Sequence, residues 1–279
     1  MGIENNISNT KPKEKVSQRL WLTNELGMKV WFKSITVEGK ENIKAIPEGA
    51  KVVIMPTHLT DLDVTLAIHA VARELNVSVM NVSIHHKFWG PQGEKGTNLS
   101  LHIAGKKNFL PIDFINRESG DKDPKMFNPE NFERAAKDME AGKGIIISVH
   151  RGKQEALEDL DDVRGGYGGV YLASLAPNTY ILPITVKLDK PSGMYADPMK
   201  TLKNRPNASV LIGKPFQLEK TEGMEHLSEI DKKRKEGKEL TKEDREEFSR
   251  LADALREKSK GVMKRMSEQL AIQTKKLAK

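Results

Sequence analysis

The stretch KVVIMPTHLTDLDVTLAIHAVAREL, residues 51–75, holds two different hydrophobic patterns in direct succession. Residues 51–57 form a short apolar run with β-branched side chains, which predicts a buried strand. Residues 61–75 carry apolar side chains at helical spacing, which predicts a helix that begins a few residues after the strand. A strand that leads directly into a helix is typical of proteins built from alternating strands and helices.

The alternation continues on both sides of this stretch. Short apolar or β-branched runs predict strands at residues 35–38, 77–84, 110–115, 144–149, 180–188 and 209–212, and helical spacing predicts helices at 129–141 and 165–175. The expected fold class is therefore α/β, with a single mixed, largely parallel sheet flanked by helices. Ligands of such sheets usually bind beyond the carboxyl ends of the strands. Pro183 interrupts the run 180–188, so we expect it near a sheet edge or a bulge.

The two ends of the chain differ in composition from this α/β region. We expect a disordered leader at residues 1–14 and an aromatic-rich, amphipathic helical segment at 15–33, interrupted near Gly27. The α/β domain then spans residues 34–218. A charged helical extension of two or three helices is predicted at 219–279, where Thr241 and Asp244 have the spacing of a capping box.

Composition excludes several classes of protein. No apolar run approaches the roughly 18 to 20 residues of a spanning helix, and the N-terminus has no apolar signal-peptide stretch, so we expect a cytoplasmic protein. The absence of Cys excludes disulfides, thiolate zinc sites and a Cys nucleophile. His85 and His86 are adjacent, but no further residues with ligand spacing accompany them, so we expect no metal.

Positive charge is concentrated at the two ends. Of the net charge of +7, only +1 belongs to residues 34–218, and the rest is shared by 1–33 and 219–279. Basic flanks suit anionic lipid, nucleic acid or a solvated surface. With only 5% aromatic residues and a balanced centre, the chain offers no stacking platform, so we expect no nucleic-acid partner.

Polar residues follow the strand predicted at 51–57. His58 comes directly after it, and Asp63 lies five residues later, where the helix begins. An Asp that reaches the second ring nitrogen of a His fixes its tautomer and supports the imidazolium, so the pair could activate a hydroxyl. In the structural alternative, the Asp63 carboxylate stabilises the helix by its interaction with the helix dipole, and His58 is an ordinary loop residue.

Two further strands end in cations. Arg117 closes the run 109–117, and a guanidinium binds phosphate through two parallel hydrogen bonds. The run 144–153, GIIISVHRGK, ends with Arg151 and Lys153 around a glycine, where an anion could bind. The alternative for Arg117 is an exposed arginine at the end of a strand.

In their order along the chain, these segments resemble the sequence blocks of the glycerolipid acyltransferase family, the glycerol-3-phosphate and 1-acylglycerol-3-phosphate acyltransferases. His58-x4-Asp63 is similar to the catalytic HxxxxD signature. FINR at 114–117 resembles the second block, and LPI at 182–184 resembles the fourth. The resemblance covers residues 34–217 and rests on collinear order.

The resemblance implies an acyltransferase domain over residues 34–218. Its expected reaction moves a fatty acyl group from acyl-CoA or acyl carrier protein to a hydroxyl of a phosphate-bearing glycerolipid precursor, a lysophospholipid or glycerol phosphate, with lysophosphatidate as first choice. His58 and Asp63 are then the catalytic pair and Arg117 an acceptor-phosphate ligand, joined by Arg151 and Lys153. The reaction requires neither an acyl-enzyme nor a cofactor beyond the acyl donor.

The third block departs from the family, which usually has Phe-Pro-Glu-Gly-Thr-Arg there. Aligning the glycine puts Arg151 where the family has its glutamate, which reverses the local charge. Two alternatives therefore stay open: an acyltransferase with a non-glycerol acceptor, and a non-catalytic lipid- or anion-binding protein on the same scaffold.

The aromatic residues of the N-terminal segment are of the kind found at membrane surfaces. Trp21, Trp31, Phe32 and the basic ends predict peripheral binding at the inner face of the membrane. The alternative is a helix packed on the protein core.

Overall fold

The computed structural model describes residues 18–57, 62–72, 74–75, 77–81, 109–111, 129–149, 167–176, 178–190, 203–219 and 221–277. Its strands are β1 (Ser34–Glu38), β2 (Lys51–Pro56), β3 (Val77–Asn81), β4 (Phe109–Pro111), β5 (Gly144–Ile147), β6 (Thr179–Leu188), β7 (Asn207–Ile212) and β8 (Phe216–Gln217). Its helices are α1 (Gln18–Trp31), α2 (Glu41–Lys44), α3 (Asp63–Val71), α6 (Pro129–Glu140), α7 (Tyr167–Leu175), α9 (Met224–Lys235) and α10 (Lys242–Leu277).

The strands form one mixed sheet in the order β1-β7-β6-β2-β5-β3-β4, and β8 also pairs with β6. The strands β6, β2, β5, β3 and β4 run parallel, as do β1 and β7, whereas β6 pairs antiparallel with β7 and β8. The largely parallel α/β sheet predicted from the alternating pattern is therefore confirmed. All seven predicted strands are present within the described residues, and the two-residue β8 is an addition.

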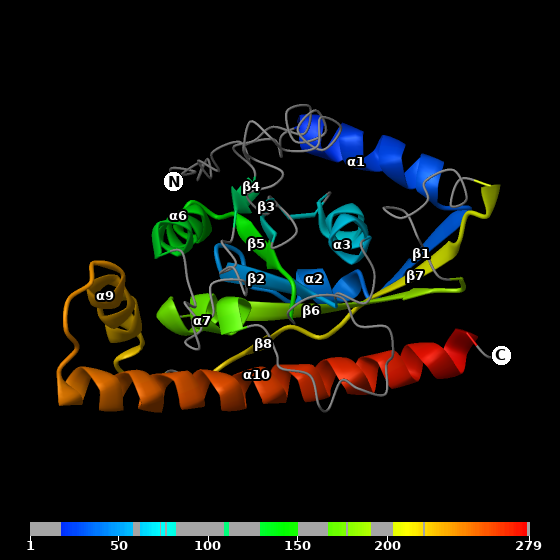
Figure 1. Cartoon of the computed structure of the whole chain (residues 1–279). Helices are drawn as coiled ribbons and strands as arrows, with labels where there is room; N and C mark the ends of the chain where they lie inside the picture. The colour runs from blue at the N-terminus through cyan, green and yellow to red at the C-terminus, as the bar shows by residue number, and fades with distance from the viewer. Residues whose placement is uncertain are drawn as a thin grey trace, which may run out of the picture.

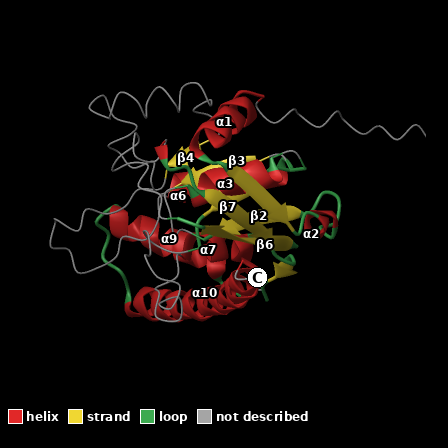
Figure 2. Cartoon of the chain, turned by 90° about the vertical axis from the view of Figure 1, so that its right-hand side faces the viewer, coloured by secondary structure: helices red, strands yellow, loops and turns green. Residues whose placement is uncertain are grey.

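Helices cover both faces of the sheet (Figures 1 and 2). Val52 and Ile54 of β2 pack into one core cluster with α1 and α3. Val53 and Met55 of the same strand pack into a second cluster with α6, α7, α9 and α10. Both faces of β2 are thus buried, which explains why its sequence is a continuous apolar run.

The helix α1 continues through Gly27, so the interruption expected there is wrong. Met28 and Phe32 are almost fully buried against the first core cluster, and Trp31 packs beside them. Burying these side chains outweighs the roughly 1 kcal/mol that a glycine costs inside a helix. Leu26 is 65% exposed on the outer face of α1.

The helix α10 runs for 36 residues along the second face of the sheet. It buries one stripe of side chains: Leu251, Leu255, Ser259, Val262, Met263, Met266, Leu270 and Gln273. Its first turn is closed by the predicted capping box, which is confirmed. The Asp244 N–H donates to Thr241 Oγ1 at 3.1 Å, and the Thr241 N–H donates to Asp244 Oδ2 at 3.2 Å.

Pro183 lies within β6, which has partners on both sides, rather than at the edge of the sheet. On one side it pairs with Met55 of β2. On the other side β8 pairs with β6 as far as Ile181 and β7 pairs from Ile184 onward, so Pro183 falls in the gap between them. Its carbonyl accepts a hydrogen bond from Gly213 there. Since a strand residue directs its N–H and C=O to the same side, the missing N–H of Pro183 falls where no regular ladder exists.

Two glycines let α7 approach the sheet closely. A Cβ at Gly168 would lie 2.7 Å from Ile147 Cδ1, and one at Gly169 would lie 2.8 Å from Met55 Cε. The neighbours of α7 at these two positions are therefore β2 and β5, and a larger residue at either position would push the helix away from the sheet.

Candidate active site

The carboxyl end of β2 carries a fully buried pair of polar side chains, Thr57 and Asp63. Thr57 follows the last residue of β2, and Asp63 is the first residue of α3. The Thr57 hydroxyl donates a hydrogen bond to Asp63 Oδ2 at 3.0 Å. A buried carboxylate is costly unless it is hydrogen-bonded, and the N-terminus of a helix adds a favourable dipole. The local fold thus supplies both stabilising interactions to Asp63.

Neighbouring strands complete the surroundings of Thr57. Its N–H donates to Ile184 O of β6 at 2.9 Å, and its hydroxyl accepts from the Val186 N–H at 3.1 Å. On the other side of β2, the Val149 N–H donates to Pro56 O at 3.0 Å. The ends of β2, β5 and β6 therefore meet beside Asp63, at the edge of the sheet where ligands are expected.

Of the predicted site residues, the structure describes Asp63. His58, Arg117, Arg151 and Lys153 lie outside the described residues. The strands that precede them in the sequence are β2, β4 and β5, which belong to the parallel part of the sheet and so end at one edge. Asp63, the last residue of the HxxxxD segment, is hydrogen-bonded to Thr57, the residue before His58. Asp63 is thus held in a fixed position next to the residue that leads into the predicted general base.

Thr57 was not predicted as a member of this site. Its only sequence signal is its position between a buried strand and a candidate catalytic His. The hydrogen bonds that give it a role come from β6, more than a hundred residues later. Such a partner could not be found from spacing.

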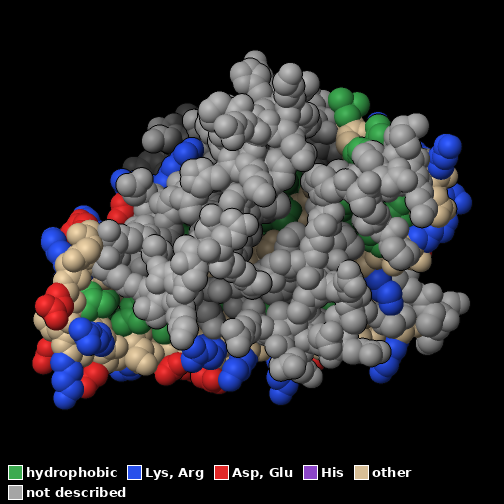
Figure 3. All heavy atoms as spheres, in the orientation of Figure 1, with side chains coloured by type: hydrophobic (Ala, Val, Ile, Leu, Met, Phe, Trp, Pro, Cys, Tyr) green, Lys and Arg blue, Asp and Glu red, His purple; other side chains and the backbone are tan. Residues whose placement is uncertain are grey.

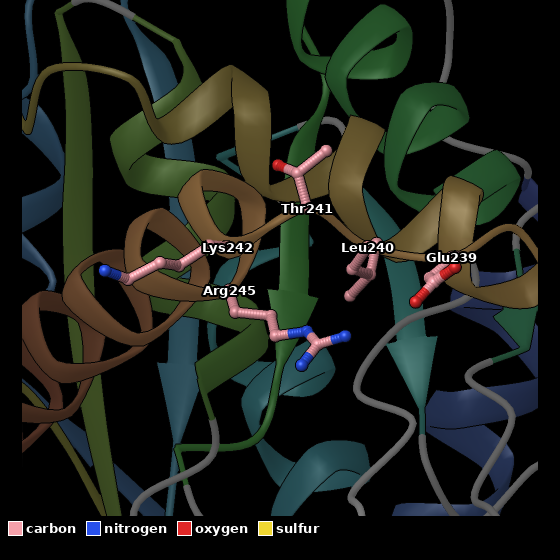
Figure 4. Close-up of a pocket in the computed structure, with 5 residues that line it drawn as sticks. All are labelled: Glu239, Leu240, Thr241, Lys242 and Arg245. Atoms are coloured by element: carbon pink, nitrogen blue, oxygen red, sulfur yellow. The ribbon is translucent and has the colours of Figure 1, made fainter.

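A separate open hollow of about 460 Å³ lies where α9 leads into α10 (Figure 4). Glu239, Leu240, Thr241, Lys242 and Arg245 line it, and Lys242 extends away from Glu239 and Leu240 in the figure. Because α9 and α10 pack on the face of the sheet opposite α3, the hollow is not part of the Asp63 site.

Ion pairs and a helix cap lie near the start of α10. The pKa of Asp244 is lowered, chiefly by its hydrogen bond from the Lys233 ammonium and then by the Thr241 N–H. The Arg250 guanidinium similarly lowers the pKa of Glu247. These are structural ion pairs and a helix cap, and neither Asp244 nor Glu247 lines the hollow.

Histidines and carboxylates also meet elsewhere. His69 Nδ1 of α3 lies 2.6 Å from Glu25 Oε1 of α1, which joins these two helices on the first face. His226 Nδ1 lies 3.8 Å from Glu247 Oε1. Within the described part of the chain, no three His, Asp or Glu side chains come together as metal ligands. None of the described helices has the length and apolar character needed to cross a membrane.

The chain has a structural likeness to a known protein but no match among family models. No protein-family model matches the chain, and neither does any curated protein. Among solved structures, the chain is similar to the 1-acyl-sn-glycerophosphate (LPA) acyltransferase PlsC from Thermotoga maritima. The TM-score is 0.43 and the identity 13%, over 79% of this chain and 77% of that one. With so few identical residues, the likeness assigns no role to any residue of this chain.

Proposed function

We propose that this protein is an O-acyltransferase that moves a fatty acyl group from a thioester donor, acyl-CoA or acyl carrier protein, to a hydroxyl of a phosphate-bearing glycerolipid precursor. Lysophosphatidate is the first choice of acceptor, and residues 34–218 form the catalytic domain. One observation carries the proposal. A fully buried carboxylate, Asp63, begins the helix after β2 and is held by the residue that directly precedes His58.

In the proposed mechanism, His58 is the general base. It takes the proton of the acceptor hydroxyl while that oxygen attacks the thioester carbonyl. Asp63 orients the imidazole and stabilises the imidazolium that forms. When the tetrahedral intermediate collapses, the carbon–sulfur bond breaks and the imidazolium returns its proton to the leaving thiolate. Atoms and charge balance without an acyl-enzyme, a metal or a further cofactor.

The acceptor phosphate is assigned to cations that follow the parallel strands in the sequence. Arg117 comes after β4, and Arg151 and Lys153 come after β5. An arginine fork binds a phosphate bidentately, and a lysine adds a point charge. Arg117→Gln should therefore raise KM for a phosphate-bearing acceptor and leave KM for the acyl donor nearly unchanged.

Membrane association is assigned to the outer face of α1. Leu26 and Val30, one helical turn apart, are 65% and 45% exposed, and Figure 3 shows hydrophobic side chains over this helix. Phe32, named with the aromatic residues above, is buried and serves the core. We expect salt-sensitive binding to anionic vesicles, weakened by Leu26→Ser with Val30→Ser. Unchanged vesicle binding of that double variant would contradict the assignment.

The first experiment is an assay of thiol release with acyl-CoA and acyl carrier protein donors. Acceptors are glycerol 3-phosphate, lysophosphatidate and hydroxyl compounds without phosphate. Wild type is compared with His58→Ala, in which acceptor-dependent release should fall about 10²- to 10⁴-fold. Equal background release by both folded proteins would reject the acyltransferase.

The altered third block favours one second candidate. Arg151, at the position of the family glutamate, makes a non-catalytic lipid- or anion-binding protein the alternative. Binding of lysophosphatidate without any thiol release would support it. Thiol release only with acceptors that lack glycerol phosphate would instead support an acyltransferase with a different acceptor.

A further inference from the structure

The Thr57 hydroxyl occupies a place that a backbone carbonyl would normally fill. The Thr57 N–H donates to Ile184 O, as in a continuing parallel ladder. The next bond of such a ladder would run from the Val186 N–H to the Thr57 carbonyl. Here the Val186 N–H donates to Thr57 Oγ1 instead, at 3.1 Å. The side chain thus continues the pairing of β2 with β6 at the point where the chain turns toward α3.

This bond determines the direction of the hydroxyl proton. A threonine hydroxyl has one proton to donate, and its oxygen accepts through lone pairs. Because the Val186 N–H approaches the oxygen, the proton is left for Asp63 Oδ2, 3.0 Å away. Three groups therefore form one directed chain, from the Val186 amide through the Thr57 hydroxyl to the Asp63 carboxylate.

We propose that Thr57 is a positioning residue that fixes the Asp63 carboxylate against β6 for its action on His58, an inference that rests on the proposed acyl transfer. Thr57 and Asp63 are both fully buried, so water does not substitute for the lost partner at either group. β6 is a suitable anchor, because it pairs with β2 along the whole length of β2. Thr57 acts through Asp63 and touches no reacting atom.

The test compares Thr57→Val with Thr57→Ser in the full-length protein. Valine keeps the shape and removes the hydroxyl, whereas serine restores it. Loss of a partner that orients a metal ligand typically costs about 10- to 100-fold in activity, and we expect a loss of similar size in kcat for Thr57→Val, with KM for the acyl donor changed less than about threefold. Thr57→Ser should recover most of the wild-type kcat.

A matched control separates positioning from a general loss of stability. Thr179 is also buried on the same sheet, and its hydroxyl donates to Ala176 O at 2.7 Å at the other end of β6. Thr179→Val removes an equivalent buried hydrogen bond and should leave kcat unchanged.

A double variant tests whether Thr57 acts through Asp63. If it does, Thr57→Val with Asp63→Asn loses no more kcat than Asp63→Asn alone. Multiplied losses would overturn the inference, as would wild-type kcat in Thr57→Val or equal damage in Thr57→Ser. An inactive wild type would instead overturn the proposed function, so the two failures are distinguishable.

Discussion

Two buried polar clusters lie on consecutive residues of β6 and face opposite sides of the sheet. On one side, the Val186 N–H and Thr57 hold the carboxylate of Asp63. On the other side, Gln273 of α10 accepts from the Thr185 hydroxyl at 3.0 Å and donates to Ser209 O and Ser209 Oγ, both at 2.8 Å. The first cluster buries a carboxylate and the second a neutral amide.

The difference in charge indicates which cluster is structural and which is functional. A neutral amide with its hydrogen bonds made is an inexpensive way to fasten a helix to a sheet. A buried carboxylate carries a desolvation penalty that is larger than that of a neutral amide, so a fold that needs only a fastening gains nothing from the charge. We therefore interpret the Gln273 cluster as structural and the Asp63 cluster as functional.

The largest expected effect comes from removing the charge of Asp63. Asp63→Asn keeps the shape and an acceptor for Thr57, so the melting temperature should stay the same or rise. Under the proposed mechanism, acyl transfer should fall about 10²- to 10⁴-fold, because a neutral amide cannot support the imidazolium of His58. Steady-state kinetics and thermal denaturation on the same preparation measure both quantities. A variant that keeps its activity but melts well below wild type would reverse the interpretation of this cluster.

The second cluster should respond in the opposite way. Gln273→Leu removes three buried hydrogen bonds and leaves Thr185 and Ser209 without their partner, so unfolding free energy should fall by about 2 to 3 kcal/mol. The kcat of the folded protein should stay within about twofold of wild type. Denaturant unfolding gives the first value and assays well below the melting temperature the second. Ile272→Ser, at the exposed neighbouring residue, is the control and should change stability little.

Ser259 tests whether satisfied hydrogen bonds make the Gln273 cluster favourable. It lies on the same buried stripe of α10, 1% exposed, and its hydroxyl finds no partner among the described residues. Ser259→Ala should therefore raise the unfolding free energy by about 1 kcal/mol, opposite in sign to Gln273→Leu. If Ser259→Ala instead lowers the unfolding free energy, the unpaired hydroxyl is not destabilising, and the hydrogen bonds of Gln273 do not explain why that residue is tolerated on the stripe.

The smallest effect is expected at the exposed capping box. The pKa of Asp244 is below its ordinary value of 3.8 because Lys233 and Thr241 bind the ionised form. A lowered native pKa means that the stabilisation is complete above the unfolded value and is lost as the pH falls through the native value. Above about pH 4, wild type should be slightly more stable than Asp244→Asn. Below about pH 4 this difference in unfolding free energy should disappear. Parallel acid unfolding curves of the two proteins would contradict this, and added salt should reduce the difference.

Strong local patterns made much of the fold predictable. The β-branched runs located seven strands, and the Thr-x-x-Asp spacing located the start of α10. The continuity of α1 at Gly27 was not predictable, because it depends on Met28 and Phe32 packing against α3 and the sheet. Of the two places predicted for Pro183, a sheet edge or a bulge, the edge is wrong, because two separate partners, β8 and β7, complete that side of β6 and leave Pro183 at the interruption between them.

The candidate site was predictable only in part, and for a similar reason. Asp63 stands out by its spacing from His58, whereas Thr57 gains its role from an amide of β6. Gln273 had a usable signal: it is a polar residue at a position where the apolar stripe of α10 demands burial. A polar side chain on a buried stripe predicts a partner across the interface, although the sequence does not say which strand supplies it.

The order of strands in the sheet has a consequence for how the chain folds. β1 pairs with β7, and Ser34 lies opposite Asn207. β2, at the centre of the core, gains β6 only when Thr179 and the residues after it have been made. During synthesis on a ribosome, β1 and β2 therefore cannot pair with β7 and β6 until most of the chain has been made. Such long-range pairing predicts slow refolding, with aggregation of the apolar β2 segment as the competing process.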